Sequence, residues 1–136
     1  MDCLFCKIAS GTVPSARVYE DAHAVAFLDI NPNNHGHTLL VPKDHARNIL
    51  DIKEETLCAI MPALKKLSRA VKDAVDADGL NIAMNNEPAA GQIVLHAHIH
   101  IIPRFTTDGH RHFEKRPYKD AGEMNAVAEK IRTALA

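Results

Sequence analysis

The nine residues HAHIHIIPR, from His96 to Arg104, place three histidines at alternate positions of an apolar run that ends in Pro-Arg. Side chains alternate between the two faces of a β-strand, so His96, His98 and His100 share one face at intervals of about 7 Å. The apolar residues between them take the other face and can bury against helices. The run therefore predicts a strand of a half-buried sheet that carries a row of imidazoles.

Other strand-like runs are rich in β-branched and aromatic side chains and are bounded by turn residues. Together they predict five strands: two within ARVYEDAHAVAFLDI (16–30) about a polar turn at Glu20 to His23, then Thr38 to Val41, LNIAMN (80–85) and IVLHAHIHII (93–102). Residues 106–119 are polar and predict an irregular loop.

Apolar residues recur at three- and four-residue steps through residues 51–79, which predicts a long amphipathic helix. Its apolar positions are Leu57, Ile60, Met61, Leu64, Leu67, Val71 and Val75. Asp51 and Glu54 resemble a capping box at its start, and Gly79 is the predicted stop. Pro62 predicts a kink or a later start. With a second helix at residues 121–136, the pattern predicts an α+β fold whose antiparallel sheet has helices on one face.

Bulk properties limit the classes of function. The chain has 136 residues, which fits a single domain over residues 1–136. Its net charge of −1 gives no sign of a nucleic-acid or membrane surface, and no run of 18 apolar residues is present. The N-terminus lacks the pattern of a secretory signal, and three cysteines in such a chain favour a reducing compartment. We therefore expect a small cytoplasmic protein.

Three interpretations of the histidine row remain open from the residues alone. The imidazoles can lie on a solvated sheet face, hold a metal-bound hydroxide, or perform phosphate chemistry, in which a neutral imidazole attacks phosphorus. The loop NEPAAGQ, residues 86–92, can aim backbone N–H groups at an anion. Asp29 can accept bonds from a ribose diol or form a plain Asx turn, and His37 can add a fourth imidazole.

A Cys-x-x-Cys motif, Cys3 and Cys6, opens the chain. Such a pair in a cytosolic protein is ambiguous between a metal site, a redox site and no special role. A redox role would favour a βαβ unit, which the pattern lacks. A structural zinc would need four nitrogen or sulfur ligands.

The order of motifs FCKIASGTVPSARVYED, AFLDINP, HGHTLLVPKDH and AAGQIVLHAHIHIIPR resembles the histidine triad (HIT) superfamily, and the bacterial branch related to the purine-nucleoside phosphoramidases in particular. The resemblance covers about residues 3 to 105. It implies a HIT-like α+β fold with a five-stranded antiparallel sheet that continues across a homodimer. It also implies hydrolysis or transfer of nucleoside monophosphates, AMP or GMP moieties, through a nucleotidyl-histidine intermediate.

The resemblance assigns roles to individual residues. His98 corresponds to the nucleophile, His100 to a hydrogen-bond donor to the phosphoryl or leaving group, and His37 to an assisting residue. Asn85, Gly91 and Gln92 match phosphate and leaving-group contacts. Asp29 matches the ribose ligand, and Phe27 and Ile30 match the walls of the base pocket. The zinc-bearing members imply a structural zinc, not needed for chemistry, with the ligands Cys3, Cys6, His45 and His96.

The sequence departs from the phosphoramidase pattern at Ile93, where those relatives usually carry a serine that reaches the leaving group. Glu87 stands at a position that is often glycine. Dinucleoside polyphosphate hydrolysis is therefore an alternative activity. A nucleotide-binding regulatory protein with little turnover and a metal-dependent hydrolase that uses the triad as ligands are the alternatives from other classes.

Overall fold

The computed structural model describes residues 2–109 and 114–136. Its helices and strands follow in the order α1 (Leu4–Ala9), β1 (Arg17–Glu20), β2 (Ala24–Leu28), β3 (Thr38–Pro42), α2 (Glu54–Ala74), β4 (Gly79–Ala83), the 3-10 helix η1 (Pro88–Ala90), β5 (Ile99–Arg104) and α3 (Ala121–Leu135). None of the described helices is both long and apolar enough to cross a membrane. Residues 110–113, part of the predicted 106–119 loop, lie outside the described residues.

The five strands form one antiparallel sheet in the order β1-β2-β3-β5-β4. Strand β5 lies between β3 and β4, with His100 opposite Leu39 on one side and Ala83 on the other. The histidine stretch therefore enters the middle of the sheet rather than an edge. The α+β fold with a five-stranded antiparallel sheet, predicted from the sequence, is confirmed.

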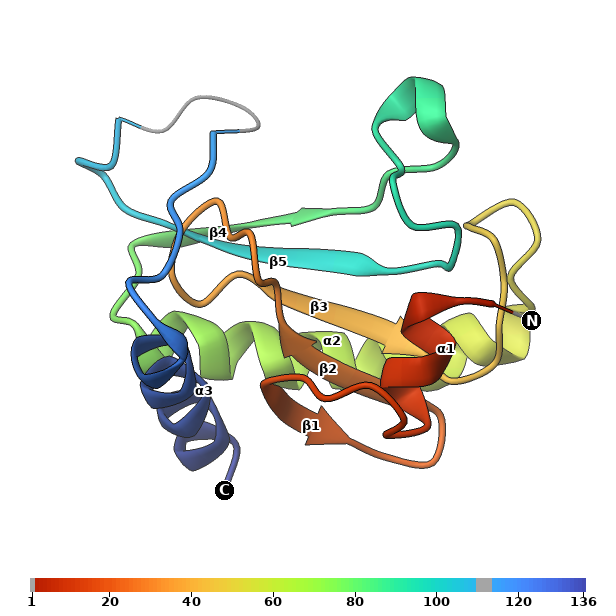
Figure 1. Ribbon diagram of the computed structural model, residues 1–136, viewed down its shortest axis with the longest axis horizontal. Helices are drawn as coiled ribbons and strands as arrows, with labels where there is room; N and C mark the ends of the chain where they lie inside the picture. Colours follow the sequence, from red (N-terminus) through yellow and green to blue (C-terminus); the bar gives the residue numbers. More distant parts are fainter. Residues whose placement is uncertain (1, 110–113) are drawn as a thin grey trace.

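Helices cover both faces of the sheet (Figure 1). On one face, α2 and α3 pack against a cluster that includes Leu40, Ile99 and Ile101. On the other face, Phe5 and Ile8 of α1 pack against side chains of β2 and β3 such as Phe27 and Leu39. The prediction of helices on one face only was incomplete, because α1 is six residues long and too short to show a helical period.

The long helix is shorter at both ends than the apolar period predicted. Its N-cap is Lys53, and Asp51 accepts hydrogen bonds from the backbone N–H groups of Arg47 and Asn48, so the predicted capping box is wrong. The helix is continuous through Pro62 and begins before it. It ends at Ala74, and Gly79 instead opens β4.

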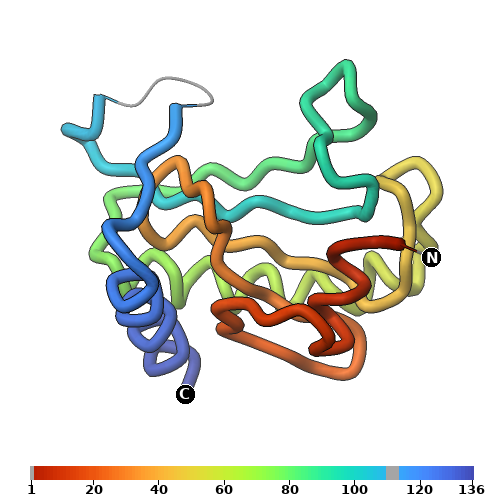
Figure 2. The backbone as a smooth tube through the Cα atoms, in the orientation of Figure 1, coloured from red at the N-terminus to blue at the C-terminus, as the bar shows by residue number. Residues whose placement is uncertain are grey.

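The fifth strand also starts later than predicted, at Ile99 instead of residue 93. Residues 93–98 form no sheet pairing because the backbone N–H of Ala97 donates to the carbonyl of Ala46, and the His96 carbonyl faces a side chain. His96 and His98 thus precede the strand. Figure 2 shows this segment passing beside α1, with the two chain termini at opposite ends of the molecule.

Candidate functional site

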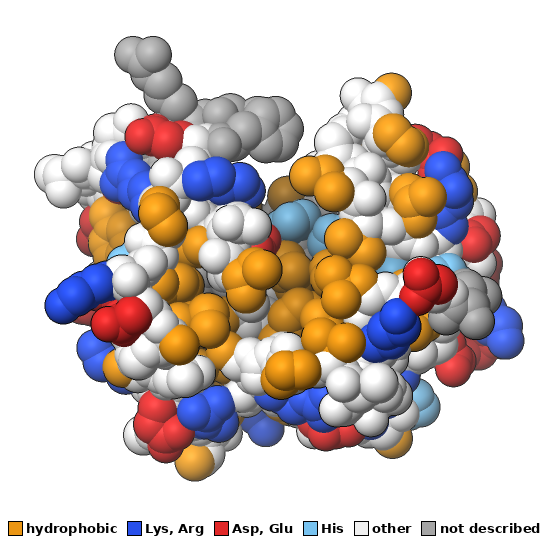
Figure 3. All heavy atoms as spheres, viewed as in Figure 1, with side chains coloured by type: hydrophobic (Ala, Val, Ile, Leu, Met, Phe, Trp, Pro, Cys, Tyr) orange, Lys and Arg blue, Asp and Glu red, His pale blue; other side chains and the backbone are white. Residues whose placement is uncertain are grey.

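A cleft of about 910 Å³ opens on the α1 face of the sheet and contains His37, His98 and His100. Figure 3 shows the hollow with histidine side chains in it and hydrophobic side chains around it. The cleft brings together most of the predicted nucleotide-binding residues, namely Phe27, Asp29, Ile30, Asn85 and Gly91. The phenyl ring of Phe27 is buried, whereas Ile30 is 72% exposed at the rim.

The ring orientation of His98 follows from a single hydrogen bond. Its Nδ1 atom lies 2.7 Å from the backbone oxygen of His96. A carbonyl oxygen can only accept, so Nδ1 carries the ring proton and Nε2 keeps its lone pair. Phe5 of α1 contacts the His98 ring edge-to-face at 5.1 Å and also contacts the ring of His96. The helix that the sequence did not predict therefore helps to fix the candidate nucleophile.

A chain of hydrogen bonds fixes His37 and His100 in the same way. The backbone N–H of Asn33 donates to Nδ1 of His37 at 3.1 Å, so Nε2 of His37 carries the proton. That Nε2–H faces Nδ1 of His100 at 2.9 Å, which leaves the proton of His100 on its own Nε2. The His100 ring lies 5.0 Å from the His98 ring. One imidazole thus offers a lone pair and its neighbour offers an N–H donor.

Burial favours the neutral forms of His98 and His100. It lowers the pKa of His98, although the His96 carbonyl and the charge of Asp29 act in the opposite direction. Burial, together with the neighbouring His37 and His98, lowers the pKa of His100 to about 4. At pH 7 the pair is therefore uncharged, which is the state that a nitrogen nucleophile requires.

The two carboxylate oxygens of Asp29 suit the two roles that the sequence suggested, an Asx turn and a contact with a ribose. Its Oδ1 accepts from the backbone N–H of Asn31 at 2.9 Å, which is the Asx turn. Its Oδ2 lies 3.7 Å from Nε2 of His37, and the residue lines the cleft. The Asx turn is confirmed, and the ribose contact stays a prediction that Oδ2 can satisfy.

A second group of side chains lies next to the cleft. The potential ligand atoms of Cys3, Cys6, His45 and His96 all lie within 4.8 Å of one another. Nδ1 of His96 is 3.3 Å from Sγ of Cys3, 3.5 Å from Sγ of Cys6 and 3.1 Å from Nδ1 of His45. Residues that are up to 93 positions apart in the sequence therefore converge on one point.

This group fits a tetrahedral zinc. In a tetrahedral site, zinc–sulfur bonds of about 2.3 Å and zinc–nitrogen bonds of about 2.0–2.1 Å imply separations of roughly 3.5–3.6 Å between sulfur and nitrogen and roughly 3.3–3.4 Å between two nitrogens. The sulfur–nitrogen separations of 3.3 to 3.5 Å and the nitrogen–nitrogen separation of 3.1 Å lie close to these values and slightly below them. Nε2 of His96 faces the backbone oxygen of Pro42 at 2.8 Å, which directs the proton there and leaves the Nδ1 lone pair toward the cysteines.

The triad itself does not form a metal site. His96 directs its ligand atom toward the cysteines, away from the cleft that His98 and His100 line. Asp29, His37 and His100 also have ligand atoms within 4.8 Å of one another. However, Nε2 of His37 is protonated because Asn33 donates to Nδ1, so this nitrogen has no lone pair for an ion. The geometry does not favour the metal-dependent hydrolase.

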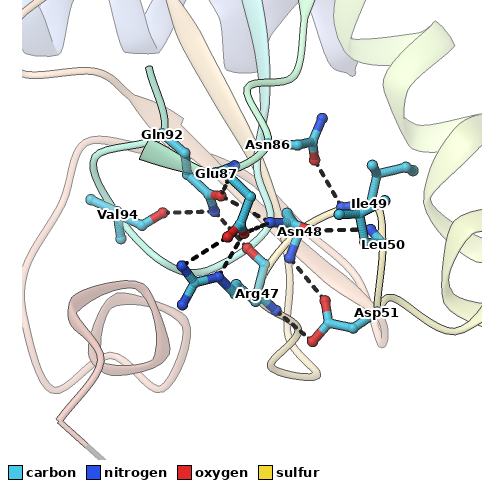
Figure 4. Close-up of polar contacts among 9 residues, drawn as sticks. All are labelled: Arg47, Asn48, Ile49, Leu50, Asp51, Asn86, Glu87, Gln92 and Val94. Carbon is cyan, nitrogen blue, oxygen red and sulfur yellow. Dashed lines mark hydrogen bonds and ion pairs between the residues drawn. The ribbon is translucent and has the colours of Figure 1, made fainter. Parts of the chain in front are cut away.

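Gln92 does not line the cleft, and its side chain makes polar contacts with neighbouring loop residues instead (Figure 4). Its side chain is buried, with Oε1 accepting from Asn48 and from the backbone N–H of Glu87. Its Nε2 donates to the backbone oxygens of Arg47 and Val94. The expected contact of Gln92 with a phosphate or leaving group is therefore not part of this geometry, because its amide is fully engaged by the protein.

Most backbone N–H groups of the loop 86–92 are engaged within the loop, so they are not available to an anion. The backbone N–H groups of Ala90 and Gln92 donate to the Glu87 carbonyl, and that of Gly91 donates to Pro88. Within the described part of the chain, the next N–H, that of Ile93, has no acceptor. Ile93 lines the cleft. Its backbone can therefore provide the donor that its side chain cannot.

Several residues that line the cleft were not predicted from the sequence. Phe5, Ile8 and Leu39 line the cleft together with Lys115, whose charge acts on His100. The spacing of Phe5 and Ile8 matches one helical turn, but one turn is too weak a signal on its own. Tyr118 accepts a hydrogen bond from the N–H of Gly36 at 2.8 Å and so braces the loop that carries His37.

Comparisons with known proteins agree with this geometry. The sequence profile of the HIT domain matches residues 10–107. The chain is 47% identical over 104 residues to Protein hit of Bacillus subtilis (strain 168), covering 76% of this chain and 72% of that protein. It is 39% identical over 104 residues to the adenosine 5′-monophosphoramidase of Schizosaccharomyces pombe, covering 76% and 75%. The crystal structure of a zinc-bound histidine triad family protein from Mycobacterium smegmatis superposes with a TM-score of 0.89 at 37% identity, covering 99% and 94%.

Proposed function

This chain belongs to the HIT domain family, and on that basis we propose that it hydrolyses purine nucleoside phosphoramidates or related nucleotidyl conjugates at the α-phosphate. The observation that carries the proposal is the hydrogen bond from Nδ1 of His98 to the His96 carbonyl. It leaves the Nε2 lone pair of a neutral imidazole in a cleft large enough for a nucleotide.

In the first step, Nε2 of His98 attacks the α-phosphorus, a P–N bond forms, and the bond to the leaving group breaks. The leaving group takes up one proton from solvent, and the Nε2–H of His100 donates a hydrogen bond at the reacting phosphoryl group. In the second step, water attacks phosphorus, the P–N bond breaks, and one proton is released with the nucleoside monophosphate. The proton taken up in the first step is thus returned in the second.

The nucleoside part fits the end of the cleft under α1. Phe5, Phe27 and Leu39 provide apolar walls for a purine, with Ile30 at the rim. Asp29 lines the same cleft with its Oδ2 3.7 Å from Nε2 of His37, and this oxygen can accept from the ribose hydroxyls. Diadenosine polyphosphates are the alternative substrates.

We also propose a structural zinc at Cys3, Cys6, His45 and His96. When bound, the ion supplies a cross-link between the N-terminal segment and the residues before β5. These four residues would hold the α1 end of the cleft in place, and His98 and His100 would remain free for the reaction. The zinc-bound relative from Mycobacterium smegmatis supports this assignment.

The homodimer remains a proposal as well. Strand β4 is an edge of the sheet, and its Ile82 is 46% exposed although it also lines the cleft. A second copy that pairs with this edge would continue the sheet and cover the exposed side chain. Light scattering of the purified protein at micromolar concentration tests the stoichiometry.

The activity is tested with a panel of adenosine phosphoramidate, an aminoacyl adenylate and diadenosine polyphosphate at equal concentration. Acid cleaves the phosphorus–nitrogen bond of a phosphohistidine, whereas base leaves it intact. An alkaline quench during turnover of labelled substrate should therefore retain nucleotidyl-protein. Labelled protein in the wild type and none in His98→Ala is the expected result. Turnover of no substrate in the panel, with nucleotide binding intact, would instead favour the regulatory protein.

A further inference from the structure

The polar network drawn in Figure 4 joins two loops that border the cleft and the candidate zinc site. We name it the Glu87 clamp and define it as Arg47, Asn48, Glu87 and Gln92. Arg47 and Asn48 belong to the loop between β3 and α2, two and three positions after His45. Glu87 and Gln92 bracket η1 in the loop between β4 and β5.

Glu87 occupies a backbone conformation that side chains rarely adopt. Its φ is 77° and its ψ is 153°, a region populated almost only by glycine. Such strain persists only where the surroundings hold the residue in place. Hydrogen bonds hold Glu87 in this conformation. Its carboxylate accepts from Nε and Nη2 of Arg47, at 2.6 and 3.0 Å, and from the side-chain amide of Asn48.

Gln92 closes the other end of the same loop. Its Oε1 accepts from the Glu87 backbone N–H at 2.8 Å and from the Asn48 side chain at 3.1 Å. The Gln92 side chain therefore joins the last residue of the segment 87–92 to its first residue. Asn48 and Gln92 are nearly inaccessible to solvent, at 1% and 3% exposure. The residue after Gln92 is Ile93, whose backbone N–H lacks an acceptor among the described residues and which lines the cleft.

We propose that Glu87 and Arg47 are positioning residues that, through Gln92, hold the Ile93 N–H where it meets the phosphate of a bound nucleotide. This proposal rests on the proposed nucleotide function. It adds that the strained conformation of the loop 87–92 positions a phosphate-binding N–H group. Glu87 is used in place of glycine because its carboxylate anchors the loop to Arg47. Gln92 accordingly acts on the substrate through Ile93.

Four variants test the clamp, namely Glu87→Gln, Arg47→Met, the double variant that combines these two, and Glu87→Gly. Glu87→Gln and Arg47→Met each remove the ion pair, and Glu87→Gly also removes the backbone strain. Lys43→Met is the matched control, because Lys43 forms an ion pair with Glu20 at 2.7 Å with similar exposure, 31% and 45% against 45% and 42%. The affinities for AMP and adenosine are measured by calorimetry, and the exchange of amides 84–93 by mass spectrometry.

Loss of the clamp should weaken AMP binding about tenfold, the equivalent of one hydrogen bond to a charged group, and leave adenosine binding unchanged. Amides 84–93 should exchange faster in Glu87→Gln and in Arg47→Met than in the wild type. In the double variant they should exchange no faster than in either single variant. Glu87→Gly should weaken AMP equally while melting no lower than Glu87→Gln, since glycine relieves the strain. Lys43→Met should match the wild type.

Wild-type AMP affinity in both Glu87→Gln and Arg47→Met would overturn the proposal. Equal losses for AMP and adenosine would also overturn it, because they would indicate a general loss of structure. A wild type that binds neither ligand would refute the nucleotide function instead. In that case the amide exchange still decides whether the clamp orders the loop.

Discussion

Nδ1 of His98 lies 2.7 Å from the backbone oxygen of His96, a residue whose own side chain belongs to the Cys/His cluster. The two residues thus connect the candidate zinc site to the candidate nucleophile through a single peptide unit. The carbonyl selects the tautomer of His98, and the cluster fixes the residue that supplies the carbonyl. The candidate nucleophile and the candidate zinc site are therefore adjacent in space but use different imidazoles.

His98→Ala should lower kcat by about 10⁴-fold or more, as the loss of a covalent nucleophile does. AMP should still bind, because the apolar walls and Asp29 are unchanged. Steady-state kinetics with the best substrate of the panel, together with calorimetry for AMP, checks both statements. Wild-type turnover by His98→Ala would exclude the nucleotidyl-histidine mechanism.

The free energy of unfolding should fall as the pH is lowered from about 6.5 to 4. The folded-state pKa of His100 is about 4 and its ordinary value is 6.5, so the unfolded chain binds more protons within this window. The contribution of His100 is fully present above its unfolded pKa, and its loss is at most about 3 kcal/mol. Urea unfolding at a series of pH values should show a shallower slope for His100→Asn than for the wild type. Parallel curves for the two proteins would contradict the assignment.

Much of the fold follows from local patterns in the sequence. β-Branched and aromatic content together with bounding turn residues suffice for the strands around Val25 and Leu40, which are buried on both faces. The helical period suffices for α2 because its apolar stripe contains Ile60 and Leu67. Helix α1 has too few residues for a period. The start of β5 depends on Ala97 bonding to the remote Ala46 instead of to a neighbouring strand, which no local pattern reveals.

The site was predicted unevenly for a similar reason. Residue type and spacing mark the histidines and cysteines as candidates, whereas the pairing of Cys3 and Cys6 with His45 and His96 follows from the resemblance to the HIT superfamily. Gln92 was expected to face the substrate, but its partner Asn48 is 44 positions away. Glu87 adopts a backbone conformation that its residue type opposes, so only the folded environment explains it. Long-range polar contacts are the part that the sequence leaves open.

AMP should bind more tightly than its 2′-deoxy form if Oδ2 of Asp29 accepts from the ribose hydroxyls. Removal of one hydroxyl leaves a charged acceptor under-satisfied, which costs about 1–3 kcal/mol of binding free energy. Asp29→Ala should erase most of the difference between the two nucleotides. The measurement is calorimetry of both ligands with both proteins, and equal affinities in the wild type would rule the contact out.

The purified protein, made without an N-terminal affinity tag, should contain one zinc ion per chain. Cys6→Ala should lose the metal and melt at least about 5 °C lower, because a loss of 1–2 kcal/mol moves the melting temperature of a domain of this size by several degrees. Cys58→Ala is the matched control, since Cys58 is exposed and lies outside the cluster. Metal analysis and a melting curve with and without added zinc measure both effects.

Because His98 and His100 bind no metal in this scheme, turnover should persist under chelation as long as the protein remains folded. A metal-free wild type whose melting temperature does not respond to zinc would show that the four ligands converge without forming a zinc site.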